Sequence, residues 1–356
     1  MSAAAPAAGT VRERWRRPRT AVVVLTIACM VAVVLSVAVG SVPIGPDRVL
    51  AVIANHVIPA RVGSSATDVQ ARIVWEFRLP RALLGLVVGA SLAVAGAVLQ
   101  AVVRNPLADP FVFGVSSGAS VAAVAVLTLA TGVLATVSVP AAAFVGALVT
   151  TLVVFLLAQR RGRVTPNRLV LAGVAMSYLL SSVTSYLVLR ASAPGMGVSQ
   201  VLSWLSGSLA AADWDDLGLP ALVLVIATVA LVLMARILNA FLIGDETAAS
   251  LGVDVGRVRL ILFIITSLLV GVVVAVSGAI GFVGLVVPHA VRLVVGSDHR
   301  WVLPASALAG GVLLVVVDIA ARLVLAPSEL PVGLLTAVIG APFFLWLLRR
   351  AGRSDR

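Results

Sequence analysis

Long apolar runs, each about the length needed to cross a lipid bilayer, recur along almost the whole of this 356-residue chain. A transmembrane helix takes roughly 20 mostly apolar residues, and no stretch between these runs is long enough to bury a core of its own. The composition agrees, because 61% of the residues are hydrophobic and only 12% are charged, against about 25% charged in soluble domains. The sequence therefore predicts an all-α, polytopic membrane protein.

Ten such runs predict ten transmembrane helices. The third and eighth runs are short and rich in Gly, Ser or Pro, so one or both are candidates for a broken or partly spanning helix. The first run is too long for a cleaved signal peptide and predicts a retained span. The predicted spans are 21–41, 81–103, 112–131, 138–159, 167–190, 217–238, 259–277, 280–295, 302–323 and 331–348.

The arginine distribution predicts the orientation. All 26 basic residues are arginine. With both termini in the cytoplasm, 19 of the 26 fall on inner segments, as the positive-inside rule requires. We therefore expect a cytoplasmic basic N-terminus over 1–20, a single transmembrane domain over 21–350 and a cytoplasmic tail over 351–356. A cytoplasmic loop then covers about 239–258.

The absence of lysine excludes some chemistry. A P-loop needs a lysine on the nucleotide phosphates, and a Schiff-base enzyme needs a lysine amine. If ATP drives this protein, a partner chain must therefore bind and hydrolyse it. The single cysteine, Cys29, and the three histidines, His56, His289 and His299, show no metal-ligand spacing, so we expect no metal site and no cofactor in this chain.

Two charged positions stand out at the outer side. Asp318 falls within the ninth span, and Arg322 lies four residues later on the same helical face. This spacing fits a salt bridge, and a charge at membrane depth is also a candidate functional site. The stretch Arg78-Leu79-Pro80-Arg81 places proline in what we expect to be the first turn of the second span. Its two arginines are either snorkelling anchors or a docking site for an acidic partner.

A polar segment, GDETAASLGVDVG (244–256), interrupts the apolar runs. Asp245 can cap a short helix, and Glu246 suits its first turn. Gly252 can end that helix, and Asp254 can cap a second short one. The segment is either a compact helix–glycine–helix projection or a plain solvated connector.

Beyond these features the chain resembles a known family, the membrane-spanning permease subunits of the iron-siderophore, haem and vitamin B12 ABC importers. The resemblance covers nearly everything from Arg78 onward. It rests on RLPR (78–81), GASLAVAGAVLQ (89–100), RNPLADPFVFGVSSGA (104–119), LVLAGVA (169–175), WLSGS (204–208), GDETAASLGV (244–253), SGAIGFVGLVVPHAVRL (277–293), DHR (298–300), DIAARL (318–323) and ELPVGLLTAVIGAPFFLWLL (329–348). The N-terminal quarter, with the outer segment 42–76, carries no such motif.

The resemblance implies a ten-helix subunit of the bacterial cytoplasmic membrane that pairs with a second permease subunit around a central pathway. Two ATPase subunits would bind ATP and Mg on the cytoplasmic side, and a solute-binding protein would deliver the substrate from outside. Membrane lipid surrounds the complex, and no nucleic-acid partner is expected.

The resemblance also implies roles for particular residues. Arg78, Arg81 and Arg322 match positions that dock the binding protein. The stretch Thr165-Pro166-Asn167 matches an inner gate, although relatives have small hydroxyl residues there. The residues that match the ATPase-coupling loop are Gly244, Asp245, Glu246, Thr247, Ala248, Ala249, Leu251 and Gly252.

The predicted function is import of an iron-siderophore, haem or cobalamin, with no enzymatic activity in this chain. The alternative is a proton-coupled secondary transporter. Such a transporter needs several ionisable groups at membrane depth, whereas Asp318 is the one acid that the sequence places within a predicted span. A membrane enzyme would need a cluster of His, Asp, Glu, Ser or Cys at one depth, and the sequence shows none. The sequence does not distinguish the three substrates, or an identical from a sister partner subunit.

Overall fold

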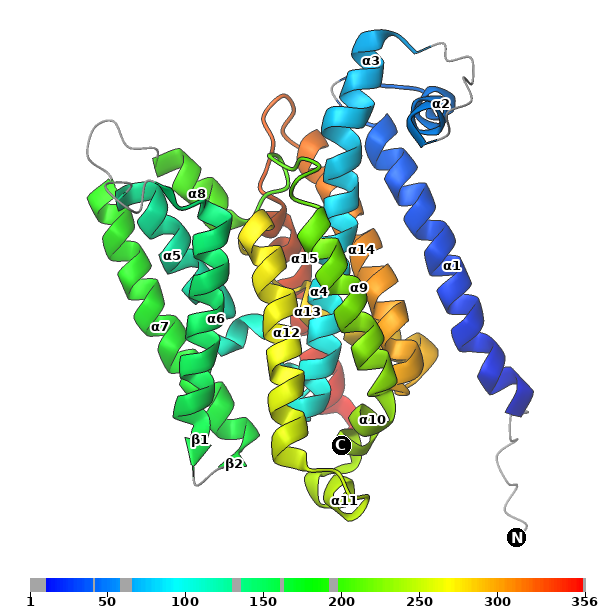
Figure 1. Cartoon of the computed structure of the whole chain (residues 1–356). Coiled ribbons are helices and arrows are strands. Elements are labelled where there is room, and N and C mark those ends of the chain that lie inside the picture. Colours follow the sequence, from blue (N-terminus) through cyan, green and yellow to red (C-terminus); the bar gives the residue numbers. More distant parts are fainter. Residues whose placement is uncertain are drawn as a thin grey trace.

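The computed structural model describes residues 11–40, 42–57, 66–129, 136–160, 163–191 and 198–354, and it is helical almost throughout (Figure 1). Within these ranges the strands are the two-residue β1 and β2, which pair antiparallel. The elements are α1 (Val11–Ala38), α2 (Pro46–Val57), α3 (Asp68–Arg72), the π-helical turn η1 (Ile73–Arg78), α4 (Leu79–Val103), the 3-10 turn η2 (Pro110–Phe113), α5 (Val115–Leu129), α6 (Val139–Ala158), β1 (Gln159–Arg160), β2 (Arg163–Val164), α7 (Pro166–Ala191), α8 (Val198–Ser206), α9 (Gly218–Leu233), α10 (Ala235–Ile243), α11 (Asp245–Ser250), α12 (Val255–Ser277), α13 (Val283–Val295), α14 (His299–Leu323) and α15 (Val332–Ser354).

Helices lie at all ten predicted spans, but they differ in length. In the described part of the chain, six helices are long and apolar enough to cross a membrane, and α9 with α10 makes a bent seventh. At the third and eighth positions the apolar helices are shorter, at Val115–Leu129 and Val283–Val295, and at the tenth position the apolar part of α15 covers Val332–Leu345. The fold is therefore all-α and polytopic, as predicted. The third and eighth spans are short, as their composition indicated, and the count of ten crossings stays a prediction.

Helix α4 lies at the centre of the bundle and is buried along nearly its whole length. It packs against α12, α13 and α14. A Cβ on Gly89 would collide with the carbonyl oxygen of Gly310 on α14, and a Cβ on Gly96 would collide with that of Gly284 on α13. Small residues permit such backbone contact where lipid provides no hydrophobic drive. These two contacts bring the backbones of α13 and α14 directly against α4.

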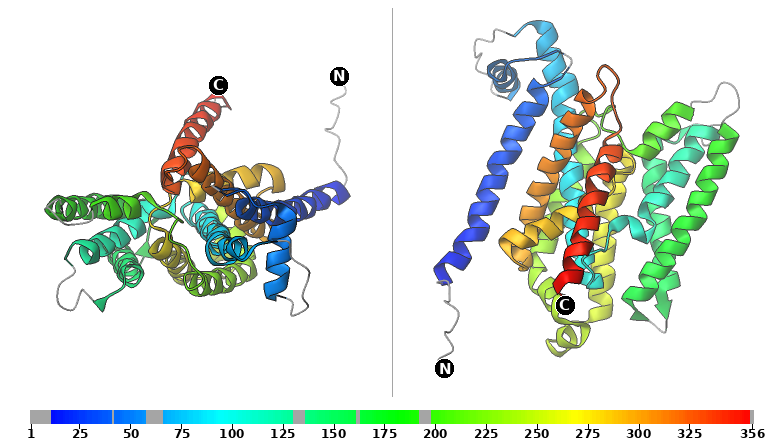
Figure 2. Two further views of the ribbon diagram at one scale, coloured as in Figure 1. Left: turned by 90° about the horizontal axis from the view of Figure 1, so that it is seen from above. Right: turned by 180° about the vertical axis from the view of Figure 1, so that it is seen from behind.

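Helices α5, α6 and α7 form a group beside this core, joined to it through α6 and α12 (Figure 2). Within the group, a Cβ on Gly118 of α5 would collide with the carbonyl oxygen of Gly146 on α6. Helix α7 leaves large apolar side chains exposed, including Leu171, Tyr178 and Leu189. These side chains can meet only lipid or another subunit in a membrane.

The two ends of the bundle carry different elements (Figure 1). The start of α1, the β1–β2 ribbon, α11 and the end of α15 lie at one end, which we call the inner end; α2, α3 and α8 lie at the other, the outer end. The segments that the arginine pattern assigned to the cytoplasm therefore share one end of the molecule.

Pro80 lies in the first turn of α4, as predicted, but the helical backbone does not begin there. It begins at Asp68, where the Thr67 hydroxyl accepts the Gln70 N–H in a capping box, and it continues through α3 and η1 into α4. Proline has no N–H for the usual helical bond, so the backbone adjusts in the turn ahead of it, and η1 occupies that turn. The described part of segment 42–76 thus extends the bundle beyond the predicted span.

The sixth span is broken, which the sequence did not predict. Helices α9 and α10 meet at an angle of 60° around Met234. No proline or glycine marks this position in the apolar run. The break turns α10 so that it leads directly into α11 at the inner end.

Candidate functional site

The polar segment projects from the inner end as α11 and the start of α12 (Figure 1). The predicted capping role of Asp245 is wrong, because Gly244 precedes α11 and no side chain caps it. The Asp245 carboxylate instead accepts hydrogen bonds from Arg259 Nη2 at 2.9 Å. Arg259 is buried on α12, and its guanidinium lies 5.6 Å from the centre of the Phe241 ring. A buried cation needs a counter-charge, so this ion pair takes the carboxylate and fastens α11 to α12.

The far end of α11 follows the predicted chemistry. Gly252 adopts a left-handed φ of 82°. Its N–H donates to Ala249 O at 2.9 Å, and the Val253 N–H donates to Ala248 O at 3.1 Å, which together terminate the helix. Asp254 then caps the next helix by accepting the Arg257 N–H at 3.0 Å. That next helix is not a second short one, as predicted, but the 23-residue span α12 itself.

One face of α11 is free of contacts with the rest of the described chain. Ala248 is fully buried against the bundle, and Thr247 is half-buried. Leu251 is 69% exposed, and Ile243, just before the helix, is 72% exposed. An apolar surface of this kind beside an acid is typical of a protein-binding site. The exposed side chains of the segment are Glu246, Ala249, Ser250, Leu251 and Asp254.

A polar contact ties α10 to the start of α14. Asn239 Nδ2 donates to Asp298 Oδ1 at 2.8 Å, and Asn239 Oδ1 accepts the His299 backbone N–H at 3.0 Å. His299 is fully buried. The element that carries α11 is therefore joined to a second span besides α12. Sequence reasoning missed Asn239; the DHR stretch at 298–300 indicated only the other side of the contact.

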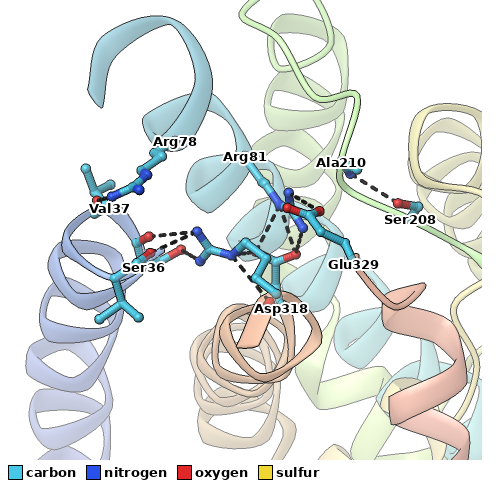
Figure 3. Close-up of polar contacts among 10 residues, drawn as sticks. Ser36, Val37, Arg78, Arg81, Ser208, Ala210, Asp318 and Glu329 are labelled. Atoms are coloured by element: carbon cyan, nitrogen blue, oxygen red, sulfur yellow. Dashed lines mark hydrogen bonds and ion pairs between the residues drawn. The ribbon is translucent and has the colours of Figure 1, made fainter. Parts of the chain in front are cut away.

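At the outer end, Arg81 joins two carboxylates from distant parts of the chain (Figure 3). Its Nε and Nη2 donate to Asp318 at 2.8 to 3.1 Å, and its Nη1 donates to Glu329 Oε2 at 2.8 Å. The Asp318 side chain is 2% exposed, whereas that of Glu329 is 41% exposed. Sequence reasoning missed Glu329, although it opens the ELP stretch that contributed to the resemblance.

Arg322 completes this group and reaches α1. Its Nε lies 3.2 Å from Asp318 Oδ2, so the i,i+4 ion pair that the spacing predicted is present. Its terminal nitrogens donate to Ser36 Oγ at 2.8 Å and to the backbone oxygens of Ser36 and Val39. Arg322 therefore links α14 to the last turn of α1.

Arg78 also holds the end of α1. Its Nη1 donates to Val37 O at 2.8 Å (Figure 3), and its Nη2 donates to Val42 O at 2.7 Å. The last carbonyls of a helix lack partners within the helix, and cations near them are favoured. Arg78, Arg81 and Arg322 are thus all engaged inside the chain, and they are buried rather than freely exposed at the rim.

The predicted gate stretch lies at the inner end. Thr165 directly follows β2, and Pro166 begins α7. Thr165 O accepts the Leu169 N–H at 3.1 Å, and Thr165 and Asn167 are exposed. The stretch is therefore accessible at the start of the helix that carries the exposed apolar face. Its gating role stays a prediction.

The acid, histidine and cysteine side chains form no metal-binding group in the part of the chain that the structure describes. No group of three or more of them lies close enough there to hold a metal ion. Asp318 is engaged by Arg81 and Arg322, so it is not a free acid at membrane depth.

A polytopic bundle with an exposed helical projection at one end and a buried charge network at the other defines a multi-pass membrane permease. The chain belongs to the FecCD transport family, whose model matches residues 28–350. The resemblance seen in the motifs is thereby confirmed, and the chain is a membrane-spanning permease of the iron-siderophore, haem and vitamin B12 ABC importer family.

The relatives are transport permeases. The chain is 49% identical to a cobalamin import system permease protein, BtuC, of Halobacterium salinarum, over 78% of this chain and 73% of the relative. It is 45% identical to the vitamin B12 import permease BtuC of Vibrio cholerae, over 81% of this chain and 86% of the relative. It is 43% identical to the hemin transport permease HmuU of Yersinia pestis over the same shares. A solved structure, described as an inward-facing conformation of a metal-chelate type ABC transporter, matches with a TM-score of 0.80 and 29% identity, over 93% of this chain and 99% of that one.

Proposed function

We propose that this permease forms the pathway of an ATP-driven importer and that two copies of a separate ATPase subunit drive it. The family and the relatives named as import permeases support the importer class. The chain has no lysine, so it cannot form a P-loop, and the ATP and Mg belong to the partner chains.

The inner end faces the cytoplasm of the cell in this proposal, with both chain termini on that side of the cytoplasmic membrane. The arginine distribution favours this orientation. It places α11 where a cytoplasmic ATPase can reach it and places the Arg81 network where an extracytoplasmic solute-binding protein can reach it.

The exposed face of α11, fastened at its base, is the observation that carries the proposal. Arg259 joins the helix to α12, and Asn239 joins α10 to α14. A force applied to α11 is therefore passed to two spans at once. When ATP closes the ATPase subunits together, α11 moves with them and opens the pathway to alternate sides of the membrane.

The pathway itself lies between two permease subunits, an identical pair or a pair with a sister chain. The exposed apolar face of α7 supports this arrangement, because it has no partner among the described residues. Thr165, Pro166 and Asn167 at the start of α7 then form the inner gate. The cargo is a metal chelate: an iron-siderophore, haem or cobalamin.

The coupling role is tested by an apolar-to-acid exchange on α11. Leu251→Asp places a charge on the face that meets the ATPase, so we expect loss of ATPase binding and of transport, as we do for deletion of 245–255. Val57→Asp is the matched control, since Val57 is 68% exposed at the outer end. ATPase co-purification and uptake into proteoliposomes measure both effects. Retained transport in Leu251→Asp would refute the assignment.

The cargo is tested with the purified solute-binding protein of the same system, titrated with ferric siderophore, haem and cobalamin. Uptake is then measured with the ligand that binds. The proton-coupled alternative predicts uptake without the ATPase that collapses with the proton gradient, and no observation in the structure favours it.

A further inference from the structure

Arg81 pairs with two carboxylates that differ in burial and in the number of hydrogen bonds that they accept from it. Asp318 is almost fully buried on α14, receives hydrogen bonds from two nitrogens of Arg81 and also pairs with Arg322. Glu329 receives a single hydrogen bond from Arg81, and its side chain is 41% exposed. Breaking a buried ion pair leaves a charge without a partner in the protein interior, which is costly. In a half-exposed ion pair, water or another ion can replace one partner at little cost. The contact with Glu329 is therefore the exchangeable one.

The exchangeable contact lines a cavity of about 390 Å³ at the outer end. Arg78, Arg81 and Arg322 contribute to the wall, and Glu329 is the one carboxylate in the described lining. The remaining lining side chains are apolar or small. Positive charge thus exceeds negative charge in a partly enclosed space, which suits an incoming carboxylate that accepts charge-assisted hydrogen bonds.

We propose that Glu329 occupies, in the free permease, the place on Arg81 that an acidic side chain of the docked solute-binding protein takes. Docking then displaces Glu329 and releases the connection 324–331 between α14 and α15. This inference rests on the proposed docking at Arg78, Arg81 and Arg322, and it adds an internal competitor and a consequence of docking.

The connection 324–331 depends on Glu329 for its position. Residues 324–329 are exposed. In the described hydrogen bonds, the other ties from this connection to the bundle lie near its two ends: the Val324 N–H donates to Ala320 O at 3.0 Å, and the Leu330 N–H donates to Ala321 O at 3.1 Å. Loss of the Glu329 contact therefore frees most of the connection.

The release would reach the transport helices through a tight junction. Gly333, in the first turn of α15, donates to Gly207 O at 3.2 Å, and a Cβ on Gly333 would collide with the Ser206 carbonyl oxygen. The neighbouring Ser208 N–H donates to Ser277 O, the last residue of α12, at 2.8 Å. A shift of the connection moves α15 against the end of α12, so docking outside is communicated to spans that also meet the coupling element inside.

The first experiment compares affinities for the purified solute-binding protein of the same system. Glu329→Gln keeps the shape of the side chain and removes its charge, so Arg81 becomes available, and we expect about three- to five-fold tighter binding. Arg81→Gln should weaken binding. Glu76→Gln is the matched control: Glu76 pairs with Arg72 at 3.3 Å and is 44% exposed, so the variant removes the same charge near the same end without touching Arg81, and we expect unchanged affinity.

The second experiment reports the release itself. In a Cys29→Ser background, Ser328→Cys carries a spin label on the connection. Docking should mobilise the label in the otherwise native chain, and Glu329→Gln should mobilise it without docking. If the Arg81→Gln variant does not fold, the double variant Arg81→Gln with Asp318→Asn is used in its place. In the double variant both members of the buried pair are neutral.

The outcomes separate the two proposals. The first possible result is that Arg81→Gln binds the solute-binding protein more weakly, Glu329→Gln binds it no more tightly than Glu76→Gln does, and the mobility of the spin label does not change. That result supports docking at Arg81 and refutes the displacement of Glu329. Unchanged binding in Arg81→Gln refutes docking at this site and the exchange with it.

Discussion

Asp318 is the residue on which the outer end of the bundle depends. Sequence spacing predicted its pairing with Arg322, because both lie on one face of one helix. It did not predict Arg81, which lies 237 residues away in the chain and provides the shorter contact. Periodicity reveals partners within an element, whereas a contact between α4 and α14 depends on how the helices pack.

Removing the Asp318 charge should be strongly destabilising. Asp318→Asn leaves Arg81 and Arg322 buried with one fewer counter-charge, and we expect a loss of about 3–5 kcal/mol. Glu329→Gln, at the exposed end of the same network, should cost less than about 1 kcal/mol. Thermal unfolding of the purified protein in detergent measures both, and equal losses would contradict the assignment of Asp318 as the buried anchor.

Asp109 gives the protein a distinct dependence on pH. Its carboxylate accepts the Phe111 N–H at 2.8 Å in the turn after α4, and burial raises the pKa of the Asp109 carboxyl from 3.8 to about 6. Between these values the folded state keeps the proton that the unfolded state has lost. The stability contributed by the protonated group is therefore complete below about pH 4 and is lost as the pH rises to 6.

Asp109→Asn keeps the shape of the side chain and cannot ionise. We expect the thermal-unfolding midpoint of the native chain, relative to that of this variant, to fall as the pH rises from 4 to 6. Above pH 6 the difference between the two midpoints should stay constant. Thermal unfolding across this pH series measures it. A difference that does not change with pH would show that the carboxyl titrates normally.

At the level of elements, the helix caps that act within a few residues were predictable from the sequence. The long-range ion pair that takes the place of one predicted cap was not. Gly252 ends α11 as expected, and Asp254 caps a helix as expected, although that helix is the long α12; each acts on backbone groups within a few residues. Asp245 failed as a cap because Arg259, on the next helix, takes its carboxylate. The 60° break at Met234 had no sequence signal, and the helix through Pro80 continued because η1 absorbs the missing hydrogen bond.

Gly252 permits a test of the coupling element with a well-matched control. Gly252→Ala introduces a side chain at φ 82° with no neighbour within 4 Å, and Gly296→Ala does the same at φ 84°. Each should cost about 1–2 kcal/mol through backbone strain. Only Gly252→Ala should weaken ATPase binding, since Gly296 lies outside α11 and its cap. Co-purification of the ATPase with each variant measures this, and equal weakening would show that strain anywhere at the inner end suffices.

At the level of the whole molecule, the apolar runs and the arginine count predicted the class and the common end of the inner segments. They indicated the short third and eighth spans, but they did not predict the break between α9 and α10 in the sixth, because composition measures apolarity and not where a helix must bend to meet its neighbours. The grouping of α5, α6 and α7 beside the core was likewise not readable from the sequence, because glycine contacts such as that of Gly118 with Gly146 determine it.

The orientation is tested by labelling intact cells. In a Cys29→Ser background, Ser328→Cys lies on the outer connection and Ser250→Cys on the exposed face of α11, and both native serines are exposed. A membrane-impermeant maleimide should label Ser328→Cys in intact cells and should label Ser250→Cys only after the membrane is opened. The reverse pattern would invert the proposed topology.

The contact of Gly96 with Gly284 has a consequence for how this chain can change over generations. Because a methyl group on Gly96 would collide with the Gly284 backbone, no second substitution at position 284 can make room for it. An alanine at position 96 becomes tolerable only if α4 and α13 move apart as whole helices. We therefore expect variation at this contact to be confined to lineages in which the neighbouring helices have also been repositioned, while the polar ends of the same helices vary independently.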